Sequence, residues 1–163
     1  MNWEQLLELA EMLAGAPVHG ETRGRPQQTH LRKANSAAYY AMFHALANSN
    51  ADALIGSGAA IRRSEEWAAT QRALNHGTSR NQMLNGRRMA TFHANIQDFA
   101  ETFIELQVQR HEADYNPNLA TPLTRTQTVR NIQRARDATQ AFLAAAPQER
   151  RRFATHLLFA RRS

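Results

Sequence analysis

The feature that most constrains the fold is a long run of helical apolar periodicity between residues 87 and 115. Large apolar residues recur there every three or four positions, at Met89, Phe92, Ile96, Phe99, Phe103 and Leu106. This spacing places them on one face of an α-helix, whereas a half-buried strand would alternate at every second residue. No stretch of the chain alternates convincingly over four or more residues. The sequence therefore predicts an all-α protein in which this helix turns one apolar face toward its neighbours.

Capping and helix-breaking residues divide the remaining chain into further elements. Asn2 is suited to cap a short first helix that ends before Gly15, and Ser64 to cap a later one. The residue before a proline avoids the helical region, so Asn116 should end the long helix. The expected loops are residues 15–28, 49–62 and 77–86, and the expected later helices are residues 29–48, 64–77, 87–115 and 121–146. A short amphipathic helix containing Phe153, Leu157 and Leu158 should close the chain.

These elements predict a single domain over residues 1–163, folded as an antiparallel helical bundle of about five main helices. The chain has 163 residues, enough for one hydrophobic core, and its apolar fraction of 42% argues against disorder. We expect the bundle proper to span about residues 29–145, followed by a basic C-terminal extension over residues 147–163. The helices of residues 29–48 and 87–115 are expected to be neighbours.

The charge of the chain points toward an anionic partner. Lys and Arg number 20 against 14 Asp and Glu, a net charge of +6, and Lys33 is the only lysine. Arginine binds phosphate bidentately and keeps its charge, and a basic domain attracts nucleic acid independently of sequence. A GC-rich genome would explain arginine over lysine, but not the net positive charge. The C-terminal extension contains Arg150, Arg151, Arg152, Arg161 and Arg162. Three alternatives stay open: these arginines bind RNA, they bind an acidic partner, or they form a solvated basic tail.

Other features exclude several classes of protein. The absence of cysteine removes disulfides, thiolate catalysis and Cys-ligated zinc. No segment approaches the uninterrupted apolar length of a membrane-spanning helix, so no membrane partner is expected. The first residues are acidic where a signal peptide would be basic, which predicts a cytoplasmic location. No metal-ligand cluster is evident, and neither a metal nor a cofactor is expected.

The helix of residues 29–48 carries a polar line between two apolar faces. Arg32, Ser36, Tyr40 and His44 follow one another at four-residue intervals. Side chains at this spacing lie along nearly one side of a helix, where their polar atoms need partners. Two alternatives stay open: either Tyr40 and His44 are core residues hydrogen-bonded to neighbouring helices, or the polar line contacts a ligand.

A matching interruption occurs in the long helix. Arg110 occupies the next position of the apolar face after Leu106, and Asp114 lies four residues later, within reach for an ion pair. An unpaired buried arginine would be strongly destabilising, so Arg110 needs a partner. The alternative is that the apolar face has ended and Arg110 lies at the rim of the bundle. We expect the polar line to face Arg110, Asp114 and Tyr115.

Two sequence elements resemble the HEPN superfamily (higher eukaryotes and prokaryotes nucleotide-binding). The first is Arg32 followed by Tyr-Tyr-Ala-Met-Phe-His at residues 39–44. The second is Arg-His-Glu-Ala-Asp-Tyr at residues 110–115, similar to the Arg-x-x-Ala-Asp-Tyr element of one large prokaryotic branch. Their order and separation fit, and the resemblance covers about residues 29–145.

The resemblance implies a helical bundle that forms a homodimer, which the small face of Ala37, Ala41 and Ala45 also suits. Many HEPN proteins are metal-independent ribonucleases that bring together an Arg-x4–6-His motif from two protomers. Others bind nucleotides or serve as partners of nucleotidyltransferases. This chain departs from the ribonuclease motif, because Arg110 is followed by a tyrosine where the motif has histidine. Arg88 and His93 fit the spacing, but lie at the start of the expected helix.

The candidate site residues follow from these patterns. Histidine suits acid–base chemistry near neutral pH, and arginine suits the charge of a phosphorane. The candidate catalytic residues are His44, Arg110 and His111, and the candidate nucleic-acid or nucleotide contacts are Arg32, Tyr40, Arg72, His76, Asp114 and Tyr115. The first interpretation is an RNA- or nucleotide-binding protein of a toxin–antitoxin or defence system, with an antitoxin or nucleotidyltransferase-type partner. The alternatives are a metal-independent endoribonuclease and a non-catalytic interaction module.

Overall fold

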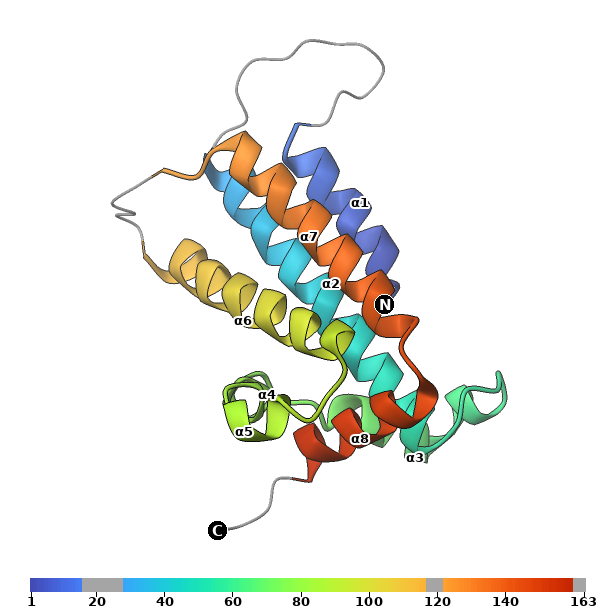
Figure 1. Cartoon of the computed structure of the whole chain (residues 1–163). Coiled ribbons are helices and arrows are strands. Elements are labelled where there is room, and N and C mark those ends of the chain that lie inside the picture. Colours follow the sequence, from blue (N-terminus) through green and yellow to red (C-terminus); the bar gives the residue numbers. More distant parts are fainter. Residues whose placement is uncertain (16–27, 117–121, 160–163) are drawn as a thin grey trace. The chain divides into compact units, whose positions relative to one another are not determined.

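The computed structural model describes residues 1–15, 28–116 and 122–159, and this part of the chain is all-α (Figure 1). It contains eight α-helices and one short 3-10 helix, and no strand within the described residues. The helices are α1 Trp3–Leu13, α2 Gln28–Leu54, α3 Glu65–Arg72, α4 His76–Met83, α5 Gly86–Met89, α6 Ala94–Tyr115, α7 Arg125–Leu143 and α8 Pro147–Leu158, with the 3-10 turn η1 at Ile61–Arg63. The predicted all-α helical bundle is confirmed.

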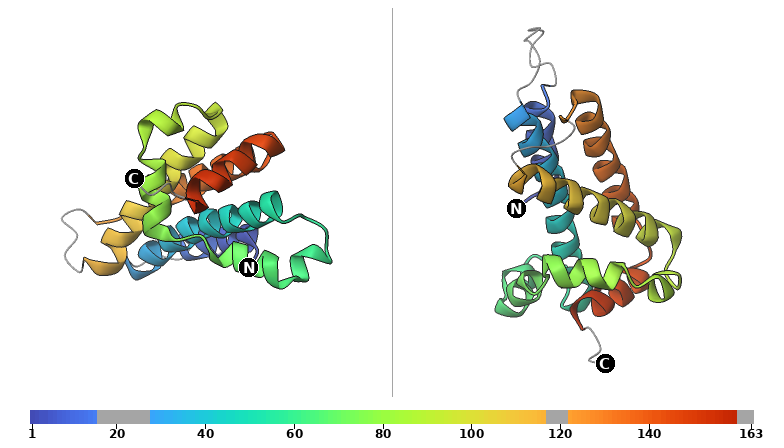
Figure 2. Two further views of the ribbon diagram at one scale, coloured as in Figure 1. Left: turned by 90° about the horizontal axis from the view of Figure 1, so that it is seen from below. Right: turned by 90° about the vertical axis from the view of Figure 1, so that its left-hand side faces the viewer.

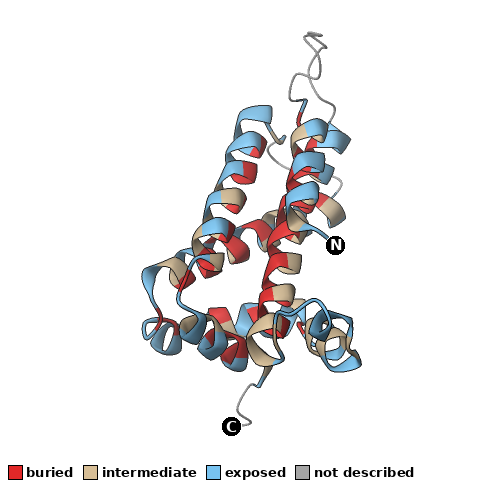
Figure 3. Ribbon diagram, turned by 90° about the vertical axis from the view of Figure 1, so that its right-hand side faces the viewer, coloured by how far each residue is buried: buried red, intermediate tan, exposed pale blue. Residues whose placement is uncertain are grey.

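The contacts within the chain group it into two compact units. The single domain over residues 1–163 stays a prediction. Unit 1 comprises residues 1–44 and 102–137, and unit 2 comprises residues 45–101 and 138–163. Helices α2, α6 and α7 each contribute residues to both units. Within each unit, the buried residues lie on the sides of the helices that face one another (Figure 3).

Unit 1 is built from α1, the first part of α2, the second part of α6 and most of α7 (Figures 1 and 2). The ring centroids of Tyr39 on α2 and Phe103 on α6 are 5.1 Å apart, so these two helices are neighbours as expected. Arg32 pairs with the end of α6 and Tyr39 with its middle, so α2 and α6 are antiparallel. By the same reasoning, α2 and α7 run in the same direction, because Gln28 bonds Leu123 just before α7 and Asn35 bonds Thr128 within it.

Unit 2 packs around aromatic side chains. The rings of Phe99 and Phe142 are stacked with centroids 4.4 Å apart, and Phe153 of α8 meets Phe142 edge-on at 5.9 Å. Phe92 packs against Phe153 at 5.5 Å. His156 of α8 contacts the backbone oxygen of Gln82 through Nε2 at 2.8 Å, which joins α8 to α4. The predicted apolar face from Met89 to Leu106 is buried along its whole length.

Several predicted boundaries are correct. The side chain of Asn2 accepts a hydrogen bond from the Glu4 N–H, and that of Ser64 accepts one from the Trp67 N–H. α6 ends at Tyr115, and the short closing helix is present as α8.

The predicted extents of two loops and one helix are wrong. Residues 49–54 continue α2, because neither glycine nor proline interrupts the chain before Gly56, whose φ of +138° ends the helix. The expected loop over residues 77–86 contains most of α4 and the start of α5, because Asn75 and Asn85 cap these helices with their side chains. Residues 90–93 interrupt the expected 87–115 helix, where the Thr91 hydroxyl donates to the Arg88 carbonyl oxygen.

The start of the last long helix is also shifted. α7 begins at Arg125, and the Gln127 N–H donates to Thr124 Oγ1 at 3.1 Å, so Thr124 caps it. Thr121, the expected cap, lies outside the described residues. α7 ends at Leu143, three residues before the expected end at residue 146, and Pro147 begins α8.

Candidate functional site

Arg110 fills its position in the apolar face of α6 by stacking on tyrosine rings. Its guanidinium carbon lies 4.8 Å from the ring centroid of Tyr40 and 5.6 Å from that of Tyr39. Its Nε lies 3.2 Å from Asp114 Oδ2, and the side chains of Arg110 and Asp114 are 17% and 16% exposed. The charge is therefore paired, half-buried and placed where the negative faces of two rings attract it.

Arg32 contacts the last turn of α6 rather than open space. Its Nη1 donates to the backbone oxygens of Ala113 at 2.9 Å and Asn116 at 3.1 Å. The last carbonyl oxygens of a helix lack the donors that the next turn would supply, and a positive charge there also complements the helix dipole. The two sequence elements of the HEPN resemblance thus meet in unit 1, where Arg32 caps α6 and Arg110 stacks on α2.

The rest of the polar line is partly buried. Ser36 is 7% exposed, while Tyr40 and His44 are half-buried. Burial lowers the pKa of His44, and the positive N-terminus acts in the same direction. Its Nδ1 is buried and forms no hydrogen bond to any residue of the described chain. Burial raises the pKa of Tyr39 well above its usual range, and the charge of Arg110 opposes that rise.

His111 and Tyr115 lie on the exposed side of α6. Their ring centroids are 4.9 Å apart, and Tyr115 is 68% exposed. The structure thus brings Arg32, Tyr40, Arg110 and Asp114 together, while His111 and Tyr115 form a separate exposed pair. Arg72 and His76 belong to unit 2, where Arg72 is exposed and His76 is half-buried.

The alanines expected to favour a dimer are buried within the chain itself. Ala37, Ala41 and Ala45 are 7%, 1% and 2% exposed. They form intramolecular packing, so the homodimer prediction depends on the HEPN resemblance alone.

Five arginines of unit 2 make up a set that we call the unit 2 arginines: Arg63, Arg72, Arg80, Arg87 and Arg88. All five are exposed, and none forms an ion pair or a side-chain hydrogen bond with another described residue. The neighbouring Arg62 behaves differently, because its Nε and Nη2 both bind the Asp52 carboxylate, at 3.0 and 2.7 Å.

The sequence around the unit 2 arginines contains a signal that the sequence analysis missed. Residues 67–97 contain no Asp or Glu. Unit 2 as a whole has eleven arginines and six acidic residues, so it carries +5 of the chain's net charge of +6. The positive charge is therefore concentrated in unit 2, and not around Arg32 and Arg110.

The C-terminal arginines are less available than the sequence suggested. Arg150 and Arg151 donate to the backbone oxygens of Ala145 and Ala53, and Arg152 pairs with Glu149 at 2.8 Å. The guanidinium of Arg152 also lies 4.7 Å from the Phe92 ring centroid. Arg161 and Arg162 lie outside the described residues.

Within the described chain, no group of three or more His, Asp or Glu side chains is placed to hold a metal ion. Among the same residues, no helix has the length and apolar character needed to cross a membrane. Scans against protein-family models, curated proteins and solved structures found no match to this chain.

Proposed function

We propose that the protein binds RNA, with the unit 2 arginines contacting the phosphate backbone. One observation carries the proposal: five exposed arginines without partners, in a unit with a 31-residue stretch, residues 67–97, free of acidic side chains. Arginine forks suit phosphate oxygens, and neutralising phosphates releases counterions from the nucleic acid. A cytoplasmic location and membership of the HEPN-like proteins are parts of the same proposal.

The cluster around Arg110 has a different part in this proposal. Arg32 and Arg110 are both engaged by protein groups, so they hold α2 against α6 and leave RNA contact to unit 2. The homodimer, and an antitoxin or nucleotidyltransferase-type partner in a defence system, rest on the sequence resemblance. Light scattering on the purified chain tests the dimer directly.

The metal-independent endoribonuclease alternative has less support. It requires two acid–base groups beside a phosphate-binding arginine. His44 is half-buried beside Tyr40, His111 is exposed beside Tyr115, and His93 is exposed in unit 2. Incubating the protein with RNA and EDTA separates the alternatives, because a metal-independent ribonuclease shortens the RNA and a binding protein leaves it intact.

The test is fluorescence anisotropy with a short labelled single-stranded RNA across a salt series. The variant Arg80→Ala/Arg87→Ala/Arg88→Ala should bind more weakly, and its dependence of log affinity on log salt should be shallower by about 2, since each contact to single-stranded nucleic acid contributes about 0.7. Lys33→Ala is the control, because Lys33 is an exposed charge of unit 1. If both variants lose the same RNA affinity for each charge removed, the net charge alone explains the binding and the unit 2 arginines have no special role. No RNA binding at all would favour the interaction-module alternative.

A further inference from the structure

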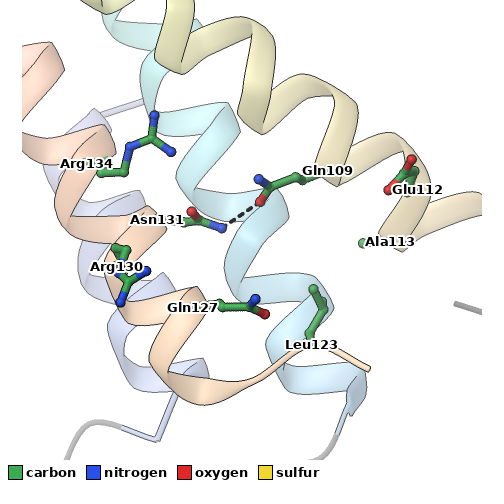
Figure 4. Close-up of a pocket in the computed structure, with 8 residues that line it drawn as sticks. All are labelled: Gln109, Glu112, Ala113, Leu123, Gln127, Arg130, Asn131 and Arg134. Atoms are coloured by element: carbon green, nitrogen blue, oxygen red, sulfur yellow. Dashed lines mark hydrogen bonds between the residues drawn. The ribbon is translucent and has the colours of Figure 1, made fainter. Parts of the chain in front are cut away.

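Unit 1 contains a polar pocket between the second part of α6 and the first part of α7 (Figure 4). Its volume is about 310 Å³, at the lower end of the range for small-molecule sites. Glu112 and Ala113 line it from α6, and Gln127 and Arg130 line it from α7. Each helix thus contributes one charged side chain, and the two charges have opposite signs.

Contacts between α6 and α7 close the pocket on one side. Arg134 forms an ion pair with Glu105. About one turn further along α6, Asn131 Nδ2 donates to Gln109 Oε1 at 2.6 Å, and we call these two residues the amide pair. Asn131 Nδ2 also donates to Asn35 Oδ1 of α2 at 2.9 Å, and Asn35 is 1% exposed. A buried network therefore holds the amide pair in place.

The amide pair is a wall for a ligand beside Arg130 and does not supply its hydrogen bonds. The atoms that the pair leaves unused are Gln109 Nε2 and Asn131 Oδ1. Figure 4 draws both atoms on the side of their bond that faces away from Arg130. A ligand on the Arg130 side therefore depends on the other polar groups of the pocket.

A second wall is fixed at Leu123, just before α7. The side-chain amide of Gln28 donates to the Leu123 carbonyl oxygen at 2.7 Å and accepts from the Leu123 N–H at 3.0 Å. Both walls are thus ordered by contacts within unit 1, which reduces the entropy that a ligand must remove on binding.

Three polar side chains of the pocket remain without partners. Glu112, Gln127 and Arg130 form no side-chain hydrogen bond or ion pair with another described residue. In Figure 4, Gln127 points from α7 toward the gap, with Arg130 at one end and Glu112 at the other. The pocket therefore offers a carboxylate, an amide and a guanidinium between two fixed walls.

A short peptide with free ends carries the complementary groups. Its ammonium group suits Glu112, its carboxylate suits Arg130, and its peptide N–H and C=O suit the amide of Gln127. An extended residue spans about 3.3–3.6 Å, so two residues separate the charged ends by about 7 Å, whereas both charges of an amino acid flank one carbon. Opposite charges on two facing helices therefore favour a peptide over a free amino acid.

We propose that this pocket binds a zwitterionic peptide of about two residues, with its ammonium group at Glu112 and its carboxylate at Arg130. The inference goes beyond the proposed RNA contact and does not depend on it, because the unit 2 arginines take no part in this site.

An NMR titration of the isotope-labelled full chain with alanyl-alanine tests the proposal. The dipeptide should bind with a dissociation constant of about 1 mM or lower, and it should shift the backbone amide signals of Glu112 and Arg130. N-acetyl-alanyl-alanine and alanyl-alanine amide each lack one charged end. Both should bind about tenfold more weakly, because one charge-assisted hydrogen bond is lost.

Three results would overturn the proposal. Alanyl-alanine that binds more weakly than about 1 mM would remove the site. Blocked dipeptides that bind as tightly as the free one would remove the charged ends from the recognition. Free alanine that binds as tightly as alanyl-alanine would exclude a peptide as the preferred ligand.

Variants assign each end of the peptide to its residue. Glu112→Gln should weaken alanyl-alanine about tenfold and leave N-acetyl-alanyl-alanine unchanged, since that ligand has no ammonium group. Arg130→Gln should weaken alanyl-alanine to the same extent and leave alanyl-alanine amide unchanged. Both side chains are exposed, so neither change removes a core contact.

Lys33→Gln is the matched control, because it removes an exposed charge of unit 1 away from the pocket lining, and it should weaken none of the ligands. Equal effects of Glu112→Gln or Arg130→Gln on all three dipeptides would contradict the assignment of the ends. The variant Arg80→Ala/Arg87→Ala/Arg88→Ala should lose RNA affinity and keep its affinity for alanyl-alanine, which separates this inference from the proposed function.

Discussion

The guanidinium carbon of Arg110 lies 4.8 Å from the centre of the Tyr40 ring, so an arginine of α6 packs on an aromatic residue of α2. Asp114 holds the same guanidinium from the following turn of α6. Stacking and ion pairing together explain how a charged residue occupies a position that the apolar periodicity assigns to the core.

Replacing Arg110 with methionine should lower the free energy of unfolding by about 1–3 kcal/mol, because the ring contact is lost and Asp114 is left half-buried without its partner. Arg110→Lys should recover only part of this, since a lysine lacks the planar fork. Denaturant unfolding measures both. RNA affinity should stay unchanged in the folded variant, and its loss would instead support the cluster as a ligand site.

Replacing Arg32 with methionine should lower the free energy of unfolding by about 1 kcal/mol, because the carbonyl oxygens of Ala113 and Asn116 lose the hydrogen bonds from Arg32. Hydrogen exchange should accelerate in the last turn of α6 and not at its start. Lys33→Met is the matched control, because it removes the adjacent positive charge from an exposed position. Equal effects of the two changes would show that the cap does not stabilise α6.

Acidification should destabilise the fold through His44. Its pKa in the folded chain is lower than the reference value of 6.5, so the unfolded chain binds more protons between those two values. The stability contributed by neutral His44 is present above pH 6.5 and is lost as the pH falls toward the lowered pKa. Thermal melts from pH 7.5 to 5.5 should show a smaller decrease for His44→Gln than for the unaltered chain.

Gly56 and Gly86 provide a matched pair of substitutions. Gly56 has a φ of +138°, and an added Cβ would lie 2.9 Å from Ile61 Cδ1, whereas a Cβ at Gly86 would meet nothing within 4 Å. Gly56→Ala should therefore lower the free energy of unfolding by about 1–2 kcal/mol. Gly86→Ala lies in α5 and should be neutral or slightly stabilising. A Gly56→Ala variant as stable as Gly86→Ala would contradict the strained end of α2.

Local patterns in the sequence determined the helical class and several details. The apolar face from Met89 to Leu106 is buried as predicted, and Asn2 and Ser64 cap their helices. The ion pair of Arg110 with Asp114 also follows from a four-residue spacing. These features depend on residues within one or two turns of each other, so short stretches of sequence contain the information. Helix lengths were less well predicted. An asparagine can lie in a loop or cap a helix, and the sequence did not show that Asn75 and Asn85 cap α4 and α5.

Only the tertiary structure decided which distant groups meet. Arg32 reaches the Ala113 carbonyl oxygen across 81 positions of sequence, and Asn35 reaches Thr128 across 93. Neither the identity of a backbone acceptor nor the burial of a single asparagine leaves a periodic signal in a sequence. The amide pair of Gln109 and Asn131 exists because α6 and α7 pack side by side and a buried network turns their side chains. Packing of complete helices fixes such contacts, and no local spacing within one helix encodes them.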